Sequence, residues 1–174
     1  MRTGNNVQTL SKLMEDKELA EEFRKFLEYQ QHSIENLNFI LWYKAYKKKF
    51  SGLSGQEQDK SPTCKPSKKR KKLSTSASNS ISAQPQNQPF RQEVEEVISV
   101  YFNKLSQFEL NLPEEIQSYT LDQLRSSTHP DCFLKAYEHV HYLIQSSSIP
   151  EFMACKYPQP TKTPSRLRNF FKSL

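Results

Sequence analysis

Residues 33–50 read SIENLNFILWYKAYKKKF, and this stretch decides the fold. Its first half is apolar on nearly every side when it is wound as a helix, and three consecutive lysines precede its last residue, Phe50. A helix that is apolar all round is usually buried on all sides. The stretch therefore predicts a helix over residues 35–49 that runs through the centre of a bundle, which the segments on either side must complete.

The flanking segments carry apolar residues at spacings of three and four, as amphipathic helices do. On the N-terminal side the apolar positions are Leu10, Leu13, Met14, Leu19, Ala20, Phe23, Phe26 and Leu27, with Asp16 as a predicted N-cap. On the C-terminal side, helices are predicted over 90–105, from Pro113, from a capping box at Thr120, and from Pro130 to a break at 146–148. With only 3 Gly, the chain lacks the tight turns of a β-rich fold. We expect a single all-α domain over residues 9–157, a helical bundle of about nine helices.

Residues 51–89 have a different composition, rich in Ser, Gln, Pro, Lys and Asn. Their only large apolar side chains are those of Leu53, Leu73 and Ile81. Such a segment cannot bury enough apolar surface to offset the entropy lost on ordering. We expect a long disordered insertion between two helices of one domain, because neither flank is complete enough to fold alone.

The net charge of +6 suggests nucleic-acid binding until the charges are located. Residues 51–89 hold seven Lys/Arg and two Asp/Glu, and residues 156–174 hold five Lys/Arg and no acid, so the remainder is mildly acidic. Nucleic-acid-binding folds carry their charge on a structured face, so we do not expect a nucleic-acid partner. The basic residues singled out are Lys68, Lys69, Arg70, Lys71 and Lys72 in the insertion, and Arg166 and Arg168 in a basic amphipathic tail over 158–174. An anionic membrane contact, a nuclear localisation signal, a weak nucleic-acid contact and a merely solubilising run are the interpretations left open for the run 68–72.

The sequence shows no catalytic centre, no metal site and no cofactor site. His139 and His141 are two residues apart and fall on different sides of a helix, so they cannot share a metal ion. The three cysteines are odd in number without CxxC spacing, which argues against zinc and a disulfide framework and favours a reducing, intracellular setting. Cys132 and Cys155 lie beside core aromatics and are expected to be buried. No apolar stretch approaches the ~20 residues of a membrane span, and the first residues do not read as a signal peptide.

Two motifs and the spacing between them resemble the regulator of G-protein signalling (RGS) domain family. They are Phe23-x-x-Phe26-Leu27 and Ser33-x-Glu35-Asn36-Leu37-x-Phe39. Further segments follow in family order: Glu109-Leu110-Asn111-Leu112, Cys132-Phe133-x-x-Ala136, His141-Tyr142-Leu143-Ile144 and Ile149-Pro150-Glu151-Phe152. The resemblance covers 9–50 and 90–157, which is everything except the insertion and the two ends.

The resemblance implies binding to a GTP-loaded Gα subunit and acceleration of its GTP hydrolysis, without a catalytic centre in this chain. The positions that match the family's Gα-facing residues are Glu35, Asn36, Asn111, Leu143, Ser147 and Glu151. Read from the residues alone, Glu35 and Asn36 could instead cap the start of their helix, and Asn111 could cap the helix at Pro113.

Three positions depart from the family pattern. Ser147 and Glu151 stand where active members carry an aspartate braced by an arginine, and the usual tryptophan is replaced by Ile40, with Trp42 two residues later. These departures keep an alternative open, an RGS-like scaffold or membrane-associated module without GTPase-activating activity. We expect a monomer in the cytoplasm, peripheral to the inner face of the plasma membrane. A nuclear role rests on the basic run 68–72 alone.

Overall fold

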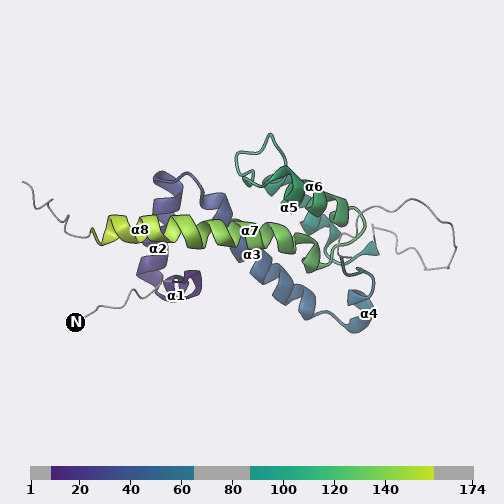
Figure 1. Ribbon diagram of the computed structural model, residues 1–174. Helices are drawn as coiled ribbons and strands as arrows, with labels where there is room; N and C mark the ends of the chain where they lie inside the picture. The colour runs from purple at the N-terminus through teal and green to yellow at the C-terminus, as the bar shows by residue number, and fades with distance from the viewer. Residues whose placement is uncertain (1–8, 65–86, 159–174) are drawn as a thin grey trace, which may run out of the picture.

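The computed structural model describes residues 9–64 and 87–158, and every regular element within these ranges is helical (Figure 1). The α-helices are α1 (Leu10–Glu15), α2 (Lys17–Tyr29), α3 (Ile34–Ser51), α4 (Gly55–Gln58), α5 (Arg91–Tyr101), α6 (Glu114–Leu124), α7 (Leu134–Leu143) and α8 (Ile149–Lys156). A 3-10 segment, η2 (Pro130–Phe133), leads into α7, and a π-helical segment, η3 (Ile144–Ser148), joins α7 to α8. The predicted all-α fold is confirmed, with a helix count close to the one expected.

Helix α2 begins as its sequence predicts and forms one wall of the core. The Asp16 carboxylate accepts hydrogen bonds from two backbone N–H groups of the first turn at 3.0 and 3.1 Å, which confirms it as the N-cap. On the buried face, the rings of Phe23 and Phe26 lie 5.2 and 5.5 Å from the ring of Phe152 on α8. These contacts fix α2 against the C-terminal part of the domain.

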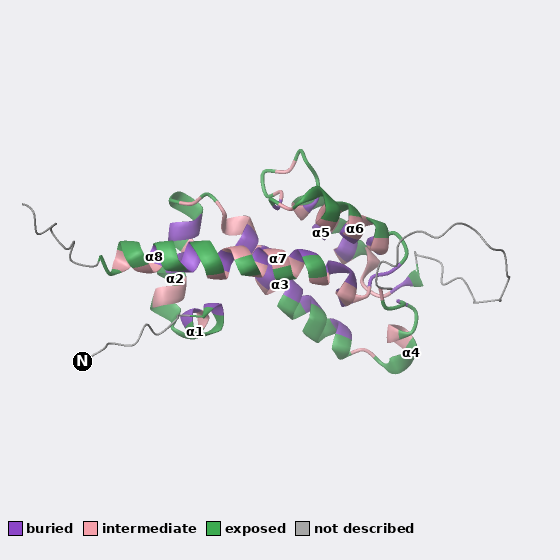
Figure 2. Cartoon of the chain, in the orientation of Figure 1, coloured by how far each residue is buried: buried purple, intermediate pink, exposed green. Residues whose placement is uncertain are grey.

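Helix α3 runs through the centre of the bundle, as predicted (Figure 2). Its buried residues are Asn36, Leu37, Phe39, Ile40, Tyr43, Tyr46 and Phe50. Phe133 of η2 is fully buried against this helix, with ring centroids 4.9 Å from Trp42, 6.0 Å from Tyr46 and 6.4 Å from Phe39. Trp42 therefore still packs on the aromatic core although it is displaced from the family's tryptophan position.

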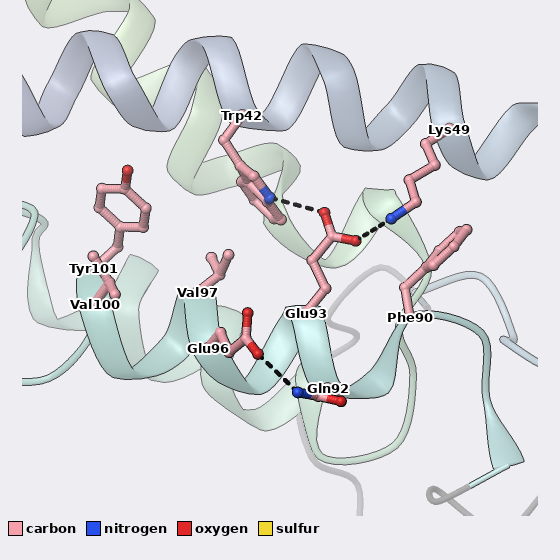
Figure 3. A pocket seen from close by; sticks show the side chains of 9 residues that line it. All are labelled: Trp42, Lys49, Phe90, Gln92, Glu93, Glu96, Val97, Val100 and Tyr101. Carbon is pink, nitrogen blue, oxygen red and sulfur yellow. Dashed lines mark hydrogen bonds and ion pairs between the residues drawn. The ribbon is translucent and has the colours of Figure 1, made fainter.

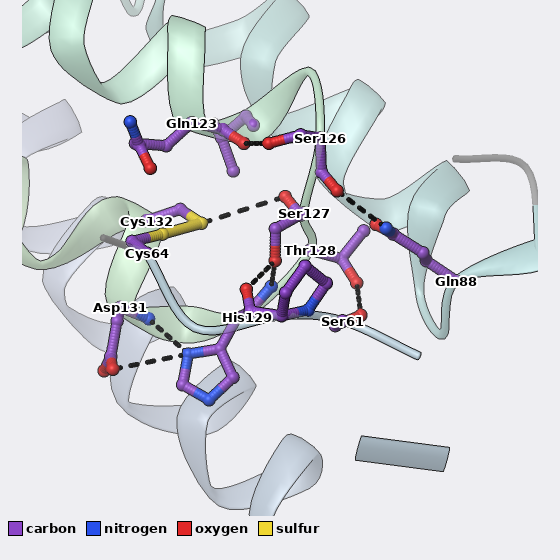
Figure 4. The surroundings of a disulfide bond; sticks show 12 residues. Ser61, Cys64, Gln88, Gln123, Ser126, Ser127, Thr128, His129, Asp131 and Cys132 are labelled. Carbon is purple, nitrogen blue, oxygen red and sulfur yellow. Dashed lines mark hydrogen bonds and ion pairs between the residues drawn. A yellow bond between two sulfur atoms is a disulfide. The ribbon is translucent and has the colours of Figure 1, made fainter. Parts of the chain in front are cut away.

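The two ends of the predicted insertion are folded, so the prediction of disorder throughout 51–89 is wrong there. Helix α4 follows α3 directly, and Ser61 is only 2% exposed. Ser61, Pro62 and Gln88 each share a hydrogen bond with the turn at 126–128, at 2.5, 2.6 and 2.8 Å (Figure 4). These contacts are polar, so the segment's poverty in apolar residues did not indicate them. Residues 65–86, which include the basic run 68–72, lie outside the described residues.

A disulfide joins Cys64 to Cys132 across a sequence separation of 68, contrary to the prediction (Figure 4). Cys132 is fully buried, as expected. Cys155 is exposed and free, so the prediction that it lies buried is also wrong. An odd number of cysteines therefore did not exclude a disulfide, since two of the three are bonded and the third is a free surface thiol.

The last three elements form one rod, which Figure 1 shows as a continuous helix from α7 to α8. The predicted break at 146–148 is instead a π-helical turn, in which the Ile149 N–H donates to the Ile144 carbonyl. Pro150 supplies the reason, because a proline lacks the N–H for the carbonyl four residues earlier and its ring collides with that carbonyl. The separate helix predicted from Thr120 is also wrong, since α6 passes through this residue and buries it completely. In the described part of the chain, no helix is both long and apolar enough to span a membrane.

Candidate functional site

The start of α3 is entered through a tight turn, and two of the predicted contact residues lie in its first turn. His32 has a positive φ of 49°, and the Ser33 N–H donates to the Leu27 carbonyl at 2.9 Å, which closes the turn. Burial raises the pKa of the Glu35 carboxyl above its usual value of 4.5. Asn36 is 8% exposed, and no described residue makes a hydrogen bond to its Oδ1 atom. Ser33 occupies the N-cap position of α3, so neither Glu35 nor Asn36 is the N-cap residue.

A second segment, the loop between α5 and α6, joins this site through Tyr101. The Tyr101 ring lies 5.4 Å from the ring of Phe39 in α3, and burial together with the Glu35 carboxylate raises the pKa of Tyr101. The Tyr101 carbonyl accepts a hydrogen bond from the Leu110 N–H at 2.9 Å, and Asn111 follows with an exposed side chain. Helix α6 has Pro113 as its N-cap residue and no side-chain cap, so Asn111 is not used for capping. Its amide is therefore presented to solvent.

The third segment is the α7–η3–α8 rod, which carries Leu143, Ser147 and Glu151. The Ser147 hydroxyl donates to Glu151 Oε1 at 3.0 Å, and Gln31 Nε2 donates to Glu151 Oε2 at 2.5 Å. The Gln31 side chain in turn accepts from the Ser33 hydroxyl at 3.4 Å. Leu143, one turn before Ser147, is partly buried. The rod is thus linked directly to the turn that leads into α3.

We call the residues Glu35, Asn36, Asn111, Leu143, Ser147 and Glu151 the candidate contact surface. The α2–α3 turn and the α5–α6 loop, two of the three segments behind it, lie on the same upper side of the molecule in Figure 1. Gln31 and Tyr101 connect its parts and were not predicted as site residues. The only sequence signal for either residue was its position relative to a family motif. Gln31 lies just before the motif that begins at Ser33, and Tyr101 lies in the helix that precedes the motif at 109–112.

A groove of about 680 Å³ between α3 and α5 is a separate surface feature (Figure 3). In it, Glu93 of α5 accepts a hydrogen bond from the Trp42 indole at 3.2 Å and pairs with Lys49 at 2.6 Å. Lys49 also lies over the Phe90 ring at 4.2 Å. These contacts dock the helix that follows the insertion onto the helix that precedes it, so a structural role accounts for them.

The described part of the chain holds no group of three or more His, Cys, Asp or Glu side chains that could bind a metal ion. The basic residues of the tail, Arg166 and Arg168, lie outside the described residues, as does the basic run.

The fold is that of an all-α helical domain. Its sequence matches the family model of the regulator of G protein signaling domain over residues 9–158, and the chain belongs to this family. RGS domains as a family bind Gα subunits and regulate their GTPase activity without being catalysts themselves. Among curated protein sequences, none matches the chain.

Proposed function

We propose that this protein binds a GTP-loaded Gα subunit through the candidate contact surface and accelerates its GTP hydrolysis. The observation that carries the proposal is the linkage of three distant segments around the start of α3. Ser147 and Glu151 are linked to this point through Gln31, and the loop that carries Asn111 is linked to α3 through Leu110, Tyr101 and Phe39. A surface built from several linked segments can hold more than one mobile loop of a partner at once.

The chemistry available at this surface is positioning. Its six residues include no lysine and no arginine, so the surface supplies no cation to the charge that develops on the transferring phosphoryl group. Gα itself holds the hydrolytic machinery, which comprises Mg²⁺, an arginine in cis and a glutamine that orients the attacking water. Restricting the switch segments to their reactive geometry lowers the barrier without new chemistry. Asn111 suits a place near the water-orienting glutamine, because its amide both donates and accepts hydrogen bonds and adds no charge.

The alternative is an RGS-like scaffold or membrane-associated module that binds Gα, another protein or lipid without accelerating hydrolysis. The observation that favours it is the replacement of the family's aspartate and arginine by Ser147 and Glu151. This exchange removes charge-assisted hydrogen bonds, each of which contributes roughly 1.5–3 kcal/mol.

Single-turnover GTP hydrolysis by a panel of Gα subunits, with and without the full-length protein, separates the two functions. We expect an acceleration that Asn111→Ala reduces by about 10- to 100-fold, the effect of losing one or two hydrogen bonds in the transition state. Gln107→Ala changes an exposed residue of the same loop and is the matched control, expected to keep full activity. Binding without acceleration would leave the scaffold function in place. Neither binding nor acceleration with any Gα would refute the proposed function and leave only a scaffold for a different partner.

A further inference from the structure

Among the described residues, Glu151 is the one that connects the rod to the α2–α3 turn by side-chain hydrogen bonds. Its two carboxylate oxygens accept from two different partners, Ser147 one turn earlier and Gln31 at a sequence separation of 120. The carboxylate is exposed, so these bonds are not a means of burying a charge. A surface carboxylate with both oxygens engaged has a defined position, which single surface contacts seldom give.

The turn that Glu151 holds is conformationally unfavourable. His32 has a φ of 49°, in the left-handed region that residues with a Cβ atom avoid. Such a residue keeps this conformation only when its surroundings enforce it. Two contacts flank it, the Gln31–Glu151 hydrogen bond before it and the Ser33 N–H to the Leu27 carbonyl after it. Glu35 and Asn36 follow within four residues, so the geometry of the turn sets where they point.

The hydrogen bond with Ser147 has a definite direction, and this direction fixes what Ser147 offers to a partner. A carboxylate only accepts hydrogen bonds, so the Ser147 hydroxyl must donate its single proton to Glu151. The lone pairs of the exposed oxygen are left for other groups, and donation to a charged acceptor strengthens their accepting power. Ser147 is therefore presented as a hydrogen-bond acceptor, suited to an N–H or O–H donor and not to a carbonyl.

We propose that Glu151 is a positioning residue of the Gα-contacting surface. It holds Ser147 as an acceptor for a peptide N–H or hydroxyl donor on a switch segment of Gα, and it locks the α2–α3 turn that orients Glu35 and Asn36. The inference rests on the proposed function, and it names how this chain performs that function with serine and glutamate in place of aspartate and arginine. The direction of the hydrogen bond between the two positions is reversed relative to the family pattern, because Glu151 accepts where an arginine would donate. Ser147 nevertheless keeps an outward-facing acceptor.

The test measures binding of full-length variants to Gα loaded with GDP and aluminium fluoride, which mimics the transition state. Glu151→Gln keeps the size of the side chain but can donate to Ser147 and occupy its lone pairs, so we expect binding about tenfold weaker, the effect of one hydrogen bond. Ser147→Ala should weaken binding to a similar extent. The double variant S147A/E151Q should be no weaker than the worse single variant, because both changes break the same unit.

Rescue distinguishes positioning from general stability. In S147D/E151R the arginine can brace a carboxylate acceptor at position 147 and donate to the Gln31 carbonyl oxygen, so most of the binding lost in Ser147→Ala should return. Amide hydrogen exchange reports on the turn without Gα, and Glu151→Gln should speed exchange of the Ser33 N–H. Glu138→Gln, an exposed change on α7, is the control expected to leave binding and exchange unchanged. Melting temperatures equal to wild type will show that the variants are folded.

The outcomes separate the inference from the function on which it rests. Weaker binding in the single variants, a non-additive double variant and recovery in S147D/E151R support the inference. Wild-type binding that Asn111→Ala weakens but that Glu151→Gln and Ser147→Ala leave unchanged would overturn the inference and keep the proposed function. Wild-type protein that binds no Gα would overturn both, whatever the exchange at Ser33.

Discussion

Breaking the Cys64–Cys132 disulfide should lower the stability of the domain substantially. The disulfide closes a covalent loop with a sequence separation of 68, which restricts the unfolded chain far more than the folded one. In the chain-entropy description a loop of this length contributes about 4 kcal/mol at 25 °C. At about 2–4 °C per kcal/mol for a chain of this size, the melting temperature should fall by about 8–16 °C.

The change is best made at Cys64, which is partly buried, whereas a serine at the fully buried Cys132 would add an unpaired hydroxyl to the core. Differential scanning calorimetry of wild type, Cys64→Ser and Cys155→Ser, each with and without reductant, gives the comparison. We expect reductant to destabilise wild type and Cys155→Ser, and to have no effect on Cys64→Ser.

Peptide mapping without reduction must accompany the calorimetry. A map that links Cys64 to Cys132, together with melting temperatures that do not respond to reductant, would refute the entropy reasoning. A map in which both thiols are free in protein purified under oxidising conditions would refute the disulfide itself.

Three further predictions concern the core, the site and the basic run. Phe133→Ala should lower the free energy of unfolding, measured in urea, by about 3–5 kcal/mol, because the Phe133 ring is fully buried. Phe108→Ala, at an exposed ring, should change it little, and equal effects of the two variants would contradict the core assignment. Because burial raises the pKa of Glu35 above 4.5, the folded state holds this proton more firmly than the unfolded state does. The free energy of unfolding should therefore fall as the pH rises from 4.5 through the raised pKa, and Glu35→Gln should remove this part of the slope in denaturation series; identical slopes would argue against it. Replacing the lysines and arginine of the run 68–72 by glutamine should weaken binding of the full-length chain to phosphatidylserine vesicles by about 1 kcal/mol per membrane-bound charge, with no change on neutral vesicles; unchanged binding would exclude a membrane role for the run.

The sequence was most informative where local and tertiary preferences agree. The Asp16 cap and the apolar pattern in the first half of residues 33–50 each predicted their helices correctly, because hydrogen bonding in the first turn and burial in the core act in the same direction. At Thr120 they disagree, and burial of the side chain outweighs its preference for a helix start. At 146–148 the break implied by three serines gives way to a π turn that accommodates Pro150.

Contacts between polar groups distant in sequence were beyond the reach of periodicity. The hydrogen bonds that join Ser61, the Pro62 carbonyl and Gln88 with the turn at 126–128 leave no apolar pattern, and a cysteine pairing depends on proximity that spacing does not encode. The candidate contact surface was predicted from the resemblance alone. Its connecting residue Gln31 was missed because its partner Glu151 is set by the register of a helix 120 positions away.

Because both ends of the insertion are anchored at one turn, the protein should tolerate changes in the length of the segment between them. Ser61, Pro62 and Gln88 attach to three consecutive residues, so the chain leaves the bundle and re-enters it at nearly the same point. The entropy of closing a flexible loop between two such points grows only with the logarithm of its length, by about 0.6 kcal/mol per doubling. Segments of very different size can therefore be spliced in between these anchors, including a fluorescent reporter, while the helices that form the contact surface keep their arrangement.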